Sequence, residues 1–393
     1  MTALPDKKLE KKPLLERVGV RYFEQRSAGK GRPPAAAQVD AVHLLNPEER
    51  AAVKRVERGA IFRSFLAGSI SAAIAAVAEV WATPLAPEGT ALLSSESLKF
   101  WAIVGGATAI AAVLEILYLY WDILRSVHEL SQVTGLQLFG ASQKDSDRAI
   151  AEALARAALE LPNPITLHPR INPRREASKW RLLAASVIYK LKVGVSNFLI
   201  KMLVRRILGR VFVRSLVNSV IPFAAVPITA AWNGVVTWLV MREARLRAMG
   251  PSAAQELVSV VFADAPVLSE AGRLAAVRAV AAAIVRTQDL HPNLVALLAE
   301  VQHKAGDTGN AELDDPGEFL RSLRVLPAGE QRLALQTLVV ACIVDGRVSR
   351  REKKLLTEAF AAVGRPVDFG PVHRLRREFV AGNGVADDAV RAL

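Results

Sequence analysis

Four polar side chains lie inside long apolar runs, where they could carry chemistry: Glu79, Glu115, Asn218 and Asn233. Glu79 is the only charged residue of the run 64–83, and Glu115 is the only one of the run 100–121. The two asparagines lie in 215–241, which contains no charged residue. Because a carboxylate is costly to bury in a bilayer, acids inside spans often mark proton or ion pathways. These four residues are therefore the candidate membrane-embedded polar site.

Depth along the helices separates the two acids. At about 1.5 Å per residue, Glu79 lies roughly 22 Å from the cytoplasmic end of its run, and Glu115 lies roughly 9 Å from the same side. Each carboxylate is therefore nearer to a membrane interface than to the midplane. We expect each acid to pair, or to reach its interface, separately, and a shared proton or ion relay is the less favoured alternative.

The sequence lacks the motifs that carry catalysis or cofactor binding in well-known enzyme classes. No nucleophile elbow, P-loop, EF-hand loop or dinucleotide fingerprint occurs, and Gln132 stands where His128-Glu129 would need a second histidine to bind zinc. The single cysteine, Cys342, lies in an apolar run and excludes an intrachain disulfide and a cysteine-based zinc site. We therefore expect a protein that is not an enzyme and has no cofactor.

Lysines and arginines cluster on both sides of the run 215–241, and residues 179–214 predict one or two basic amphipathic helices. Each cationic side chain near an anionic leaflet contributes about 1 kcal/mol to membrane binding. The candidate lipid-contacting residues are Lys201, Arg205, Arg206, Arg210, Arg214, Arg242 and Arg245. Nucleic acid would attract the same charge, but few aromatic residues are interleaved, so we expect no nucleic-acid partner.

The elements that would hold these residues are helices throughout, because no segment alternates as a strand does. Residues 46–49 (NPEE) form a helix start, and the runs 64–83 and 100–121 predict a transmembrane hairpin. Residues 1–63 hold 14 lysines and arginines, whereas 84–98 hold none. By the positive-inside rule, the N-terminus is cytoplasmic and the connecting loop lies outside.

The uncharged run 215–241 admits three arrangements. A single span would place one of its flanking arginine clusters outside, against the positive-inside rule. A re-entrant hairpin that turns at 221–227 keeps both clusters inside, with limbs of roughly 15–20 Å that are too short to cross. A buried hairpin in a soluble bundle is the third arrangement. We favour the re-entrant hairpin and leave the other two open.

Composition divides the chain into five parts. They are a basic segment 1–45, the transmembrane hairpin 46–125, a cytoplasmic helix with a proline-rich linker 126–178, basic helices with the apolar run 179–250, and a soluble helical domain 251–393. Residues 1–250 hold 34 basic and 20 acidic side chains, while the rest of the chain holds 17 and 18. The boundary falls at Met249-Gly250-Pro251, a helix-stop signature.

Residues 14–26 predict an amphipathic helix in the basic N-terminal segment. One face carries Leu14, Leu15, Val18 and Tyr22, and the remaining faces carry Arg17, Arg21 and Glu24. Such a helix either lies on anionic lipid or packs against the body of the protein. The two alternatives stay open.

The stretch CIVDGRVSRREKKLL predicts a helix, a tight turn and a second helix. Asp345-Gly346 ends the first helix, and Ser349 to Glu352 is a capping box that opens the next. With Val348, this pattern resembles the turn of TerB-like domains, the helical modules named from tellurite-resistance proteins. The stretch 263–272 (ADAPVLSEAG) is a weaker echo of the same turn.

The TerB-like resemblance implies a metal site at Asp345 and Glu352. Most of the acids that accompany them in the family are basic residues here: Arg347, Arg350 and Arg351. The first 250 residues, through LNPEER, RAALELPNP and IPFAAVPITAAWN, resemble bacterial membrane proteins of no assigned function, and the last part has a likeness to EcsC-type proteins. This second resemblance implies a bacterial membrane location.

The sequence as a whole predicts an all-α, membrane-anchored protein with a transmembrane hairpin, an apolar hairpin and a C-terminal soluble bundle. The first hypothesis is a non-enzymatic bacterial inner-membrane protein, stress or envelope related, whose N-terminus and domain 251–393 are cytoplasmic and whose domain binds an unidentified protein partner. The second is a transporter or channel accessory with a polar path through Glu79, Glu115 and Asn233. The third is a soluble helical protein that enters membranes conditionally. Homo-oligomerisation stays open.

Overall fold

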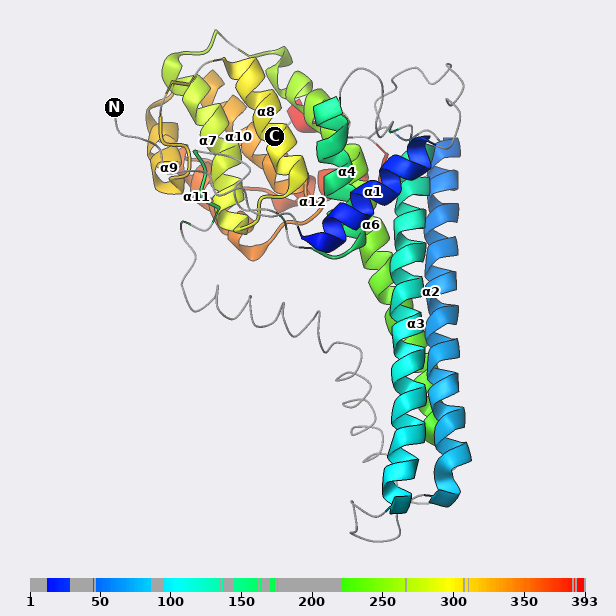
Figure 1. Ribbon diagram of the computed structural model, residues 1–393. Helices are drawn as coiled ribbons and strands as arrows, with labels where there is room; N and C mark the ends of the chain where they lie inside the picture. The colour runs from blue at the N-terminus through cyan, green and yellow to red at the C-terminus, as the bar shows by residue number, and fades with distance from the viewer. Residues whose placement is uncertain are drawn as a thin grey trace, which may run out of the picture.

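The chain folds into helices throughout the part that the structure describes. The computed structural model describes residues 13–28, 45, 47–85, 95–134, 136, 144–161, 163, 170–173, 175, 221–265, 267–306, 308–309, 311–383, 385 and 387–391. Within these ranges every regular element is a helix and no strand forms, which confirms the all-α prediction. Figure 1 shows a long stalk that carries a helical head at one end.

Three helices form the stalk: α2 (Pro47–Ala82), α3 (Ser95–Val133) and the first half of α6 (Ile221–Ala263). α2 begins where residues 46–49 predict, and it continues into the short 3₁₀ helix η1 (Thr83–Leu85). α2 and α3 run antiparallel, and α6 packs along both (Figure 1). Among the described residues, Pro47–Leu85 and Leu98–Val133 are long and apolar enough to cross a membrane. The predicted hairpin therefore has the length that a span requires.

The apolar run does not turn back at 221–227, so that part of the re-entrant prediction is wrong. These residues open α6, which continues through Pro227 to Ala263 without a break. From Ile221 to Met241 the helix covers roughly 30 Å, the thickness of a bilayer core. A proline inside a helix removes one hydrogen bond, and packing along α2 and α3 stabilises the helix on either side of it. Residues 215–220 lie outside the described part of the chain.

The helix stop expected at Met249-Gly250-Pro251 is also wrong, because α6 runs across it. Pro251 has no amide hydrogen, and its ring crowds the carbonyl group one turn earlier. Asn293, at the start of α8 (Pro292–Ala305), binds beside this point: its Nδ2 donates to the carbonyl oxygens of Leu246 at 2.9 Å and Val344 at 2.8 Å. Gly250 leaves the space that this side chain fills, since a Cβ there would overlap Asn293 Oδ1. A side chain from another helix thus joins α6 to the end of α10 where the stalk passes into the head.

The head is a bundle of short helices around a core of small apolar side chains. α7 (Glu270–Thr287) and α10 (Ala328–Ile343) pack together at its centre and are buried along most of their length. The bundle is completed by α8, α9 (Pro316–Val325), α11 (Arg350–Ala362), α12 (Phe369–Ala381) and α13 (Asp387–Arg391). A helix that is buried on most sides lacks a broad polar face, which explains the stretches AVAAAIV of α7 and LVVACI of α10.

Two further helices pack where the stalk meets the head. α1 (Leu14–Ala28) lies obliquely across the end of the stalk, and α4 (Lys144–Ala158) packs between α1 and α6 (Figure 1). The Arg156 guanidinium of α4 forms a 2.6 Å ion pair with Glu16 of α1, whose carboxylate is buried. The predicted N-terminal helix is therefore attached to the body of the protein.

Gly250→Ala is expected to destabilise the head, because the added methyl group displaces the Asn293 amide from two carbonyl groups. Each buried group left unpaired costs about 1–3 kcal/mol, so the free energy of unfolding should fall by about 2–5 kcal/mol. Chemical denaturation of the detergent-purified protein, followed by circular dichroism, measures the change. Gly234→Ala is the matched control on the same helix, where a Cβ would lie 3.6 Å from Ile61 in an ordinary contact. Equal stability of the two variants would contradict the role of Asn293.

Candidate functional site

The interior of the stalk holds a hydrogen bond between two of the predicted polar residues. Asn233 Nδ2 on α6 donates to Glu115 Oε1 on α3 at 2.7 Å, and both side chains are buried. Gly68 on α2 makes room for this amide, since a Cβ there would lie 2.6 Å from Asn233 Nδ2. The pair therefore depends on all three stalk helices. In low-dielectric surroundings such a hydrogen bond is stronger than in water.

Two further polar contacts lie between the stalk helices nearer to the head. Thr237 Oγ1 of α6 donates to Ser64 Oγ of α2 at 2.7 Å. Arg63 of α2 donates to Asp122 Oδ1 and Ser126 Oγ of α3 at 2.7 and 2.9 Å. Asp122 is fully buried, and the guanidinium offsets part of its desolvation. Sequence reasoning missed these residues because hydroxyls are common inside spans and Arg63 lies just outside the apolar run.

Glu79 lies apart from the Glu115–Asn233 pair. It is on α2 beyond Gly68, roughly 16 Å further toward the far end of the stalk at about 1.5 Å per residue. Asn218 lies outside the residues that the structure describes. Of the four predicted membrane-embedded polar residues, the structure thus brings Glu115 and Asn233 together and places Glu79 elsewhere.

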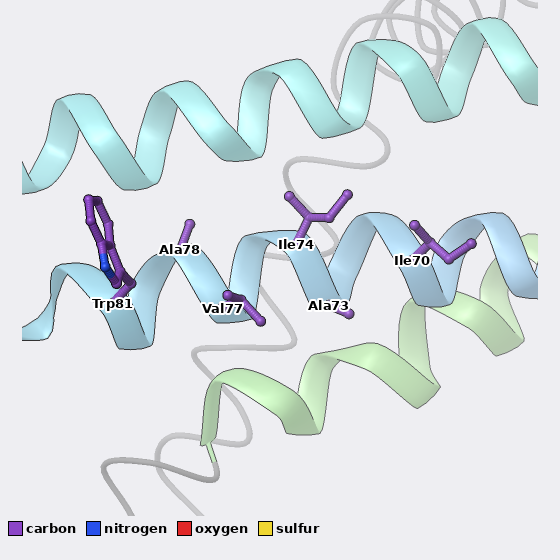
Figure 2. A pocket seen from close by; sticks show the side chains of 6 residues that line it. All are labelled: Ile70, Ala73, Ile74, Val77, Ala78 and Trp81. Carbon is purple, nitrogen blue, oxygen red and sulfur yellow. The ribbon is translucent and has the colours of Figure 1, made fainter.

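The outer surface of the stalk is apolar. An open groove of about 490 Å³ lies along α2. Figure 2 shows the side chains that line it, which are Ile70, Ala73, Ile74, Val77, Ala78 and Trp81. Ile70 is 60% exposed and Trp81 is 73% exposed. Large apolar side chains are likewise exposed on α3 and on the first half of α6, among them Leu114 and Trp238. Polar contacts inside and apolar side chains outside are typical of a surface that faces lipid.

The arginines that follow the apolar run bind protein groups where the stalk joins the head. Arg245 pairs with Glu57 of α2 at 3.0 Å, and Arg242 Nη2 donates to the carbonyl oxygen of Gly346 at 2.9 Å. Lipid contact by Arg242 and Arg245 stays a prediction, and these protein partners compete for the same donors. The other predicted lipid-contacting residues lie outside the described part of the chain: Lys201, Arg205, Arg206, Arg210 and Arg214.

Glu243 of α6 connects this joint to the head. Its Oε1 accepts from Arg247 Nε at 3.0 Å and lies 2.9 Å from His291 Nε2. His291 Nδ1 accepts the amide hydrogen of Asn293, so the ring presents Nε2–H to the carboxylate. Burial opposes ionisation of Glu243, but the hydrogen bonds and charges of His291 and Arg247 hold its pKa at about 2. The carboxylate is therefore charged and fixed at neutral pH.

The turn between α10 and α11 lies against the same joint. Asp345 Oδ1 accepts the amide hydrogen of Arg347 at 2.8 Å, and Gly346 adopts a φ of 77°, a left-handed conformation that glycine accommodates. Ser349 and Glu352 form a capping box, as predicted. Burial raises the pKa of Asp345 to about 6, and burial together with the Asp345 charge raises that of Glu352 to about 8. The Glu352 carboxyl group is therefore mostly protonated at neutral pH.

The metal site that the TerB-like resemblance implies would rest on Asp345 and Glu352 alone. Glu352 Oε2 already accepts the amide hydrogen of Ser349 at 2.7 Å. Among the described residues no group of three or more His, Cys, Asp or Glu side chains could hold an ion. Zinc and calcium sites take more protein ligands than two. The pair does not fit such a site, and the turn and the capping box account for both acids.

The weaker echo of this turn at 263–272 is completed by a distant acid. Ser269 caps α7, but Gly272 stands where a capping box has its acid. Glu330 of α10, 61 residues away from Ser269, replaces it: its Oε1 accepts the Ser269 amide hydrogen at 2.6 Å, and its Oε2 accepts from Ser269 Oγ at 2.8 Å. A Cβ at Gly272 would lie 2.5 Å from that carboxyl group. Gly272 stands where a capping box would have its acid, and its lack of a side chain leaves room for the Glu330 carboxylate that takes the place of that acid.

No protein-family model, curated protein or solved structure matches the chain. The likeness to TerB-like and EcsC-type proteins therefore rests on the quoted residues alone. Within the described residues, the polar groups at the stalk interior, the joint and the two turns hold helices together. Cys342 is fully buried, and burial raises the pKa of its thiol, so it behaves as a small apolar side chain.

The head is expected to lose stability as the pH rises through the range in which Glu352 ionises. Its folded-state pKa of about 8 lies above the ordinary value of 4.5. The folded protein therefore holds a proton that the unfolded chain releases, and the free energy of unfolding declines between these two pH values. Asp345, whose pKa is raised from 3.8 to about 6, adds a decline in the same direction at lower pH.

Glu352→Gln should flatten this decline, because the amide oxygen still accepts from Ser349 and no longer ionises. Thermal unfolding followed by circular dichroism across this pH range measures the slope. Glu270→Gln, which removes an exposed acid at the start of α7, should leave the slope as in the original protein. An unchanged slope in Glu352→Gln would assign the pH dependence to other groups.

Proposed function

We propose that this protein is a non-enzymatic scaffold anchored in the inner membrane of a bacterium, with its N-terminus and head on the cytoplasmic side. The observation that carries this proposal is the path of α6, whose apolar first half packs in the stalk and whose second half is part of the head. Because the anchor and the head share one continuous helix, the distance and orientation between them are fixed. The head is thereby presented at a set distance from the membrane.

The orientation is supported by the distribution of charge. The end of the stalk that joins the head is also the end where α2 begins (Figure 1), and residues 1–63 hold 14 lysines and arginines. The opposite end follows Trp81, and residues 84–98 hold no basic side chain. By the positive-inside rule, this asymmetry across the α2–α3 hairpin favours a cytoplasmic head. The arginines at 205–214 precede α6 in sequence and are an exception to the rule if α6 crosses the bilayer, so the proposed orientation rests on the hairpin.

The head is the part that would bind a partner, which we expect to be a protein. Residues 251–393 are nearly neutral, with 17 basic and 18 acidic side chains, so electrostatic attraction to nucleic acid is not favoured. The likeness of the Asp345 turn to TerB-like domains supports a stress or envelope role. Metal binding at that turn forms no part of the proposal.

Cysteine labelling tests the orientation in a Cys342→Ala background. Val267→Cys, at a fully exposed position of the head, should react with a membrane-impermeant maleimide only after the inner membrane is opened. Thr90→Cys, between the two predicted spans, should react in cells whose inner membrane is intact. Labelling of position 267 in intact cells would overturn the cytoplasmic placement. Release of the protein by alkaline carbonate would instead favour conditional membrane binding.

A second candidate function is that of a transporter or channel accessory, and the buried Glu115–Asn233 hydrogen bond is the observation that favours it. A carboxylate held between three helices in an apolar stalk is a common element of proton pathways. The separate position of Glu79 weakens the idea of one continuous path. The scaffold therefore remains the first proposal.

Glu115→Gln separates the two functions, since the amide oxygen still accepts from Asn233 while the charge is removed. A scaffold should complement a deletion strain under membrane stress as well as the original protein does, and a transport accessory should not. Arg245→Ala is the comparison, because it breaks the ion pair with Glu57 at the joint and should impair a scaffold. Loss of complementation in Glu115→Gln alone would favour transport.

A further inference from the structure

α1 packs against the body of the protein through one face only. Val20 and Phe23 are buried, and Phe23 stacks on His128 of α3 with ring centroids 5.9 Å apart. A Cβ at Gly19 would lie 3.0 Å from the Ala155 side chain of α4. Together with the Glu16–Arg156 ion pair, these contacts account for the attachment of the helix. The apolar residues at positions 14, 15 and 18 are exposed.

The opposite face of α1 leaves those apolar side chains exposed. Leu14 is 67% exposed, Val18 is 52% exposed and Leu15 is 38% exposed. Arg17 and Arg21 are exposed on one side of this strip. On its other side the Arg26 guanidinium lies 5.9 Å from the Tyr22 ring centroid. An apolar strip bordered by arginines is typical of a helix that lies at the surface of an anionic bilayer.

The position of the strip along the stalk places it at the lipid boundary. α3 runs toward the head, so His128 is further from the apolar span than Leu124. The C-terminal half of α1 contacts His128, through Phe23 and Ser27, whereas Gly19 contacts Leu124. α1 crosses the stalk obliquely, and these contacts put its residues before Gly19 on the side of the apolar span, where α3 carries Trp121. That tryptophan is half-exposed and has the Arg125 guanidinium 5.7 Å from its ring, as at a membrane interface.

We propose that α1 lies in the headgroup region of the cytoplasmic leaflet, with Leu14, Leu15 and Val18 inserted among the lipid chains and Arg17 and Arg21 near anionic headgroups. This inference rests on the proposed function, because it takes the head to be on the cytoplasmic side of a stalk that crosses the bilayer. The occupant of the strip is lipid, since arginines border the strip and α1 packs on α3 one turn from Trp121 and Arg125, which mark the end of the apolar span. One face of α1 then packs against the body of the protein, and the opposite face lies on anionic lipid, so both alternatives for this helix hold.

The experiment places an environment-sensitive fluorophore on single cysteines of the full chain, in a Cys342→Ala background and in lipid nanodiscs. Val18→Cys reports on the strip, Glu24→Cys reports on another face of α1, and Ile74→Cys reports on the exposed surface of the stalk. The nanodiscs contain phosphatidylcholine with phosphatidylglycerol, and nitroxide-labelled lipids quench fluorophores that lie within the bilayer. We expect quenching at positions 18 and 74 and none at position 24.

The outcomes separate this inference from the proposed function. Quenching at 74 with equal, low quenching at 18 and 24 would overturn the interfacial helix and leave the anchor intact. An absence of quenching at 74 would overturn the anchor itself. Replacing phosphatidylglycerol with phosphatidylcholine, or introducing Arg17→Gln with Arg21→Gln, should reduce quenching at 18 and leave that at 74 unchanged. Retention of full quenching at 18 in both cases would overturn the role of the arginines.

Discussion

One hydrogen-bonded side chain determines how the two halves of this molecule are connected. A Gly-Pro pair in the middle of α6 removes an amide donor where the stalk becomes the head. Asn293 of a neighbouring helix donates to the carbonyl of Leu246, just before this pair, and to the carbonyl of Val344 at the end of α10. Because the same amide bonds two helices at once, the head cannot rotate about the proline without breaking contacts within its own core. The position of the head relative to the stalk therefore depends on the hydrogen bonds of this one amide.

The stalk obeys a second constraint, which is that buried polar atoms need partners within an apolar environment. Glu115 with Asn233, Ser64 with Thr237, and Arg63 with Asp122 each join two different helices. Their geometry fixes the depth and rotation of the helices, which apolar contacts alone leave free to slide. The outward face needs no such specificity, and it is covered by isoleucine, valine, leucine and tryptophan.

Charged groups gather at the joint, where an apolar stalk meets a water-exposed bundle. The arginines after the apolar run bind protein groups at this joint: Arg245 pairs with Glu57, Arg247 with Glu243, and Arg242 donates to the Gly346 carbonyl. Ion pairs at such a boundary are partly shielded from water, so their geometry constrains the helices that they join. α1 and α4 pack over the same region, and α4 also contacts α6, so these two helices help to hold the joint in place.

The sequence by itself determined the helical class, the two apolar helices, the helix start at 46–49 and the capping box at Ser349, because these depend on residues close in the chain. Tertiary structure decided the rest. The local rule that Gly-Pro ends a helix did not hold, because α6 packs against α8 and α10 on the far side of the proline. The missing acid of the 263–272 turn was supplied by Glu330. Glu115 is hydrogen-bonded to Asn233 and not to Glu79. Which side chains meet depends on their depth along the stalk and on the helix face that carries them, and the pattern of one segment does not specify the neighbouring helix. The apolar run continued as one helix since its neighbours, α2 and α3, offered a surface along which to pack.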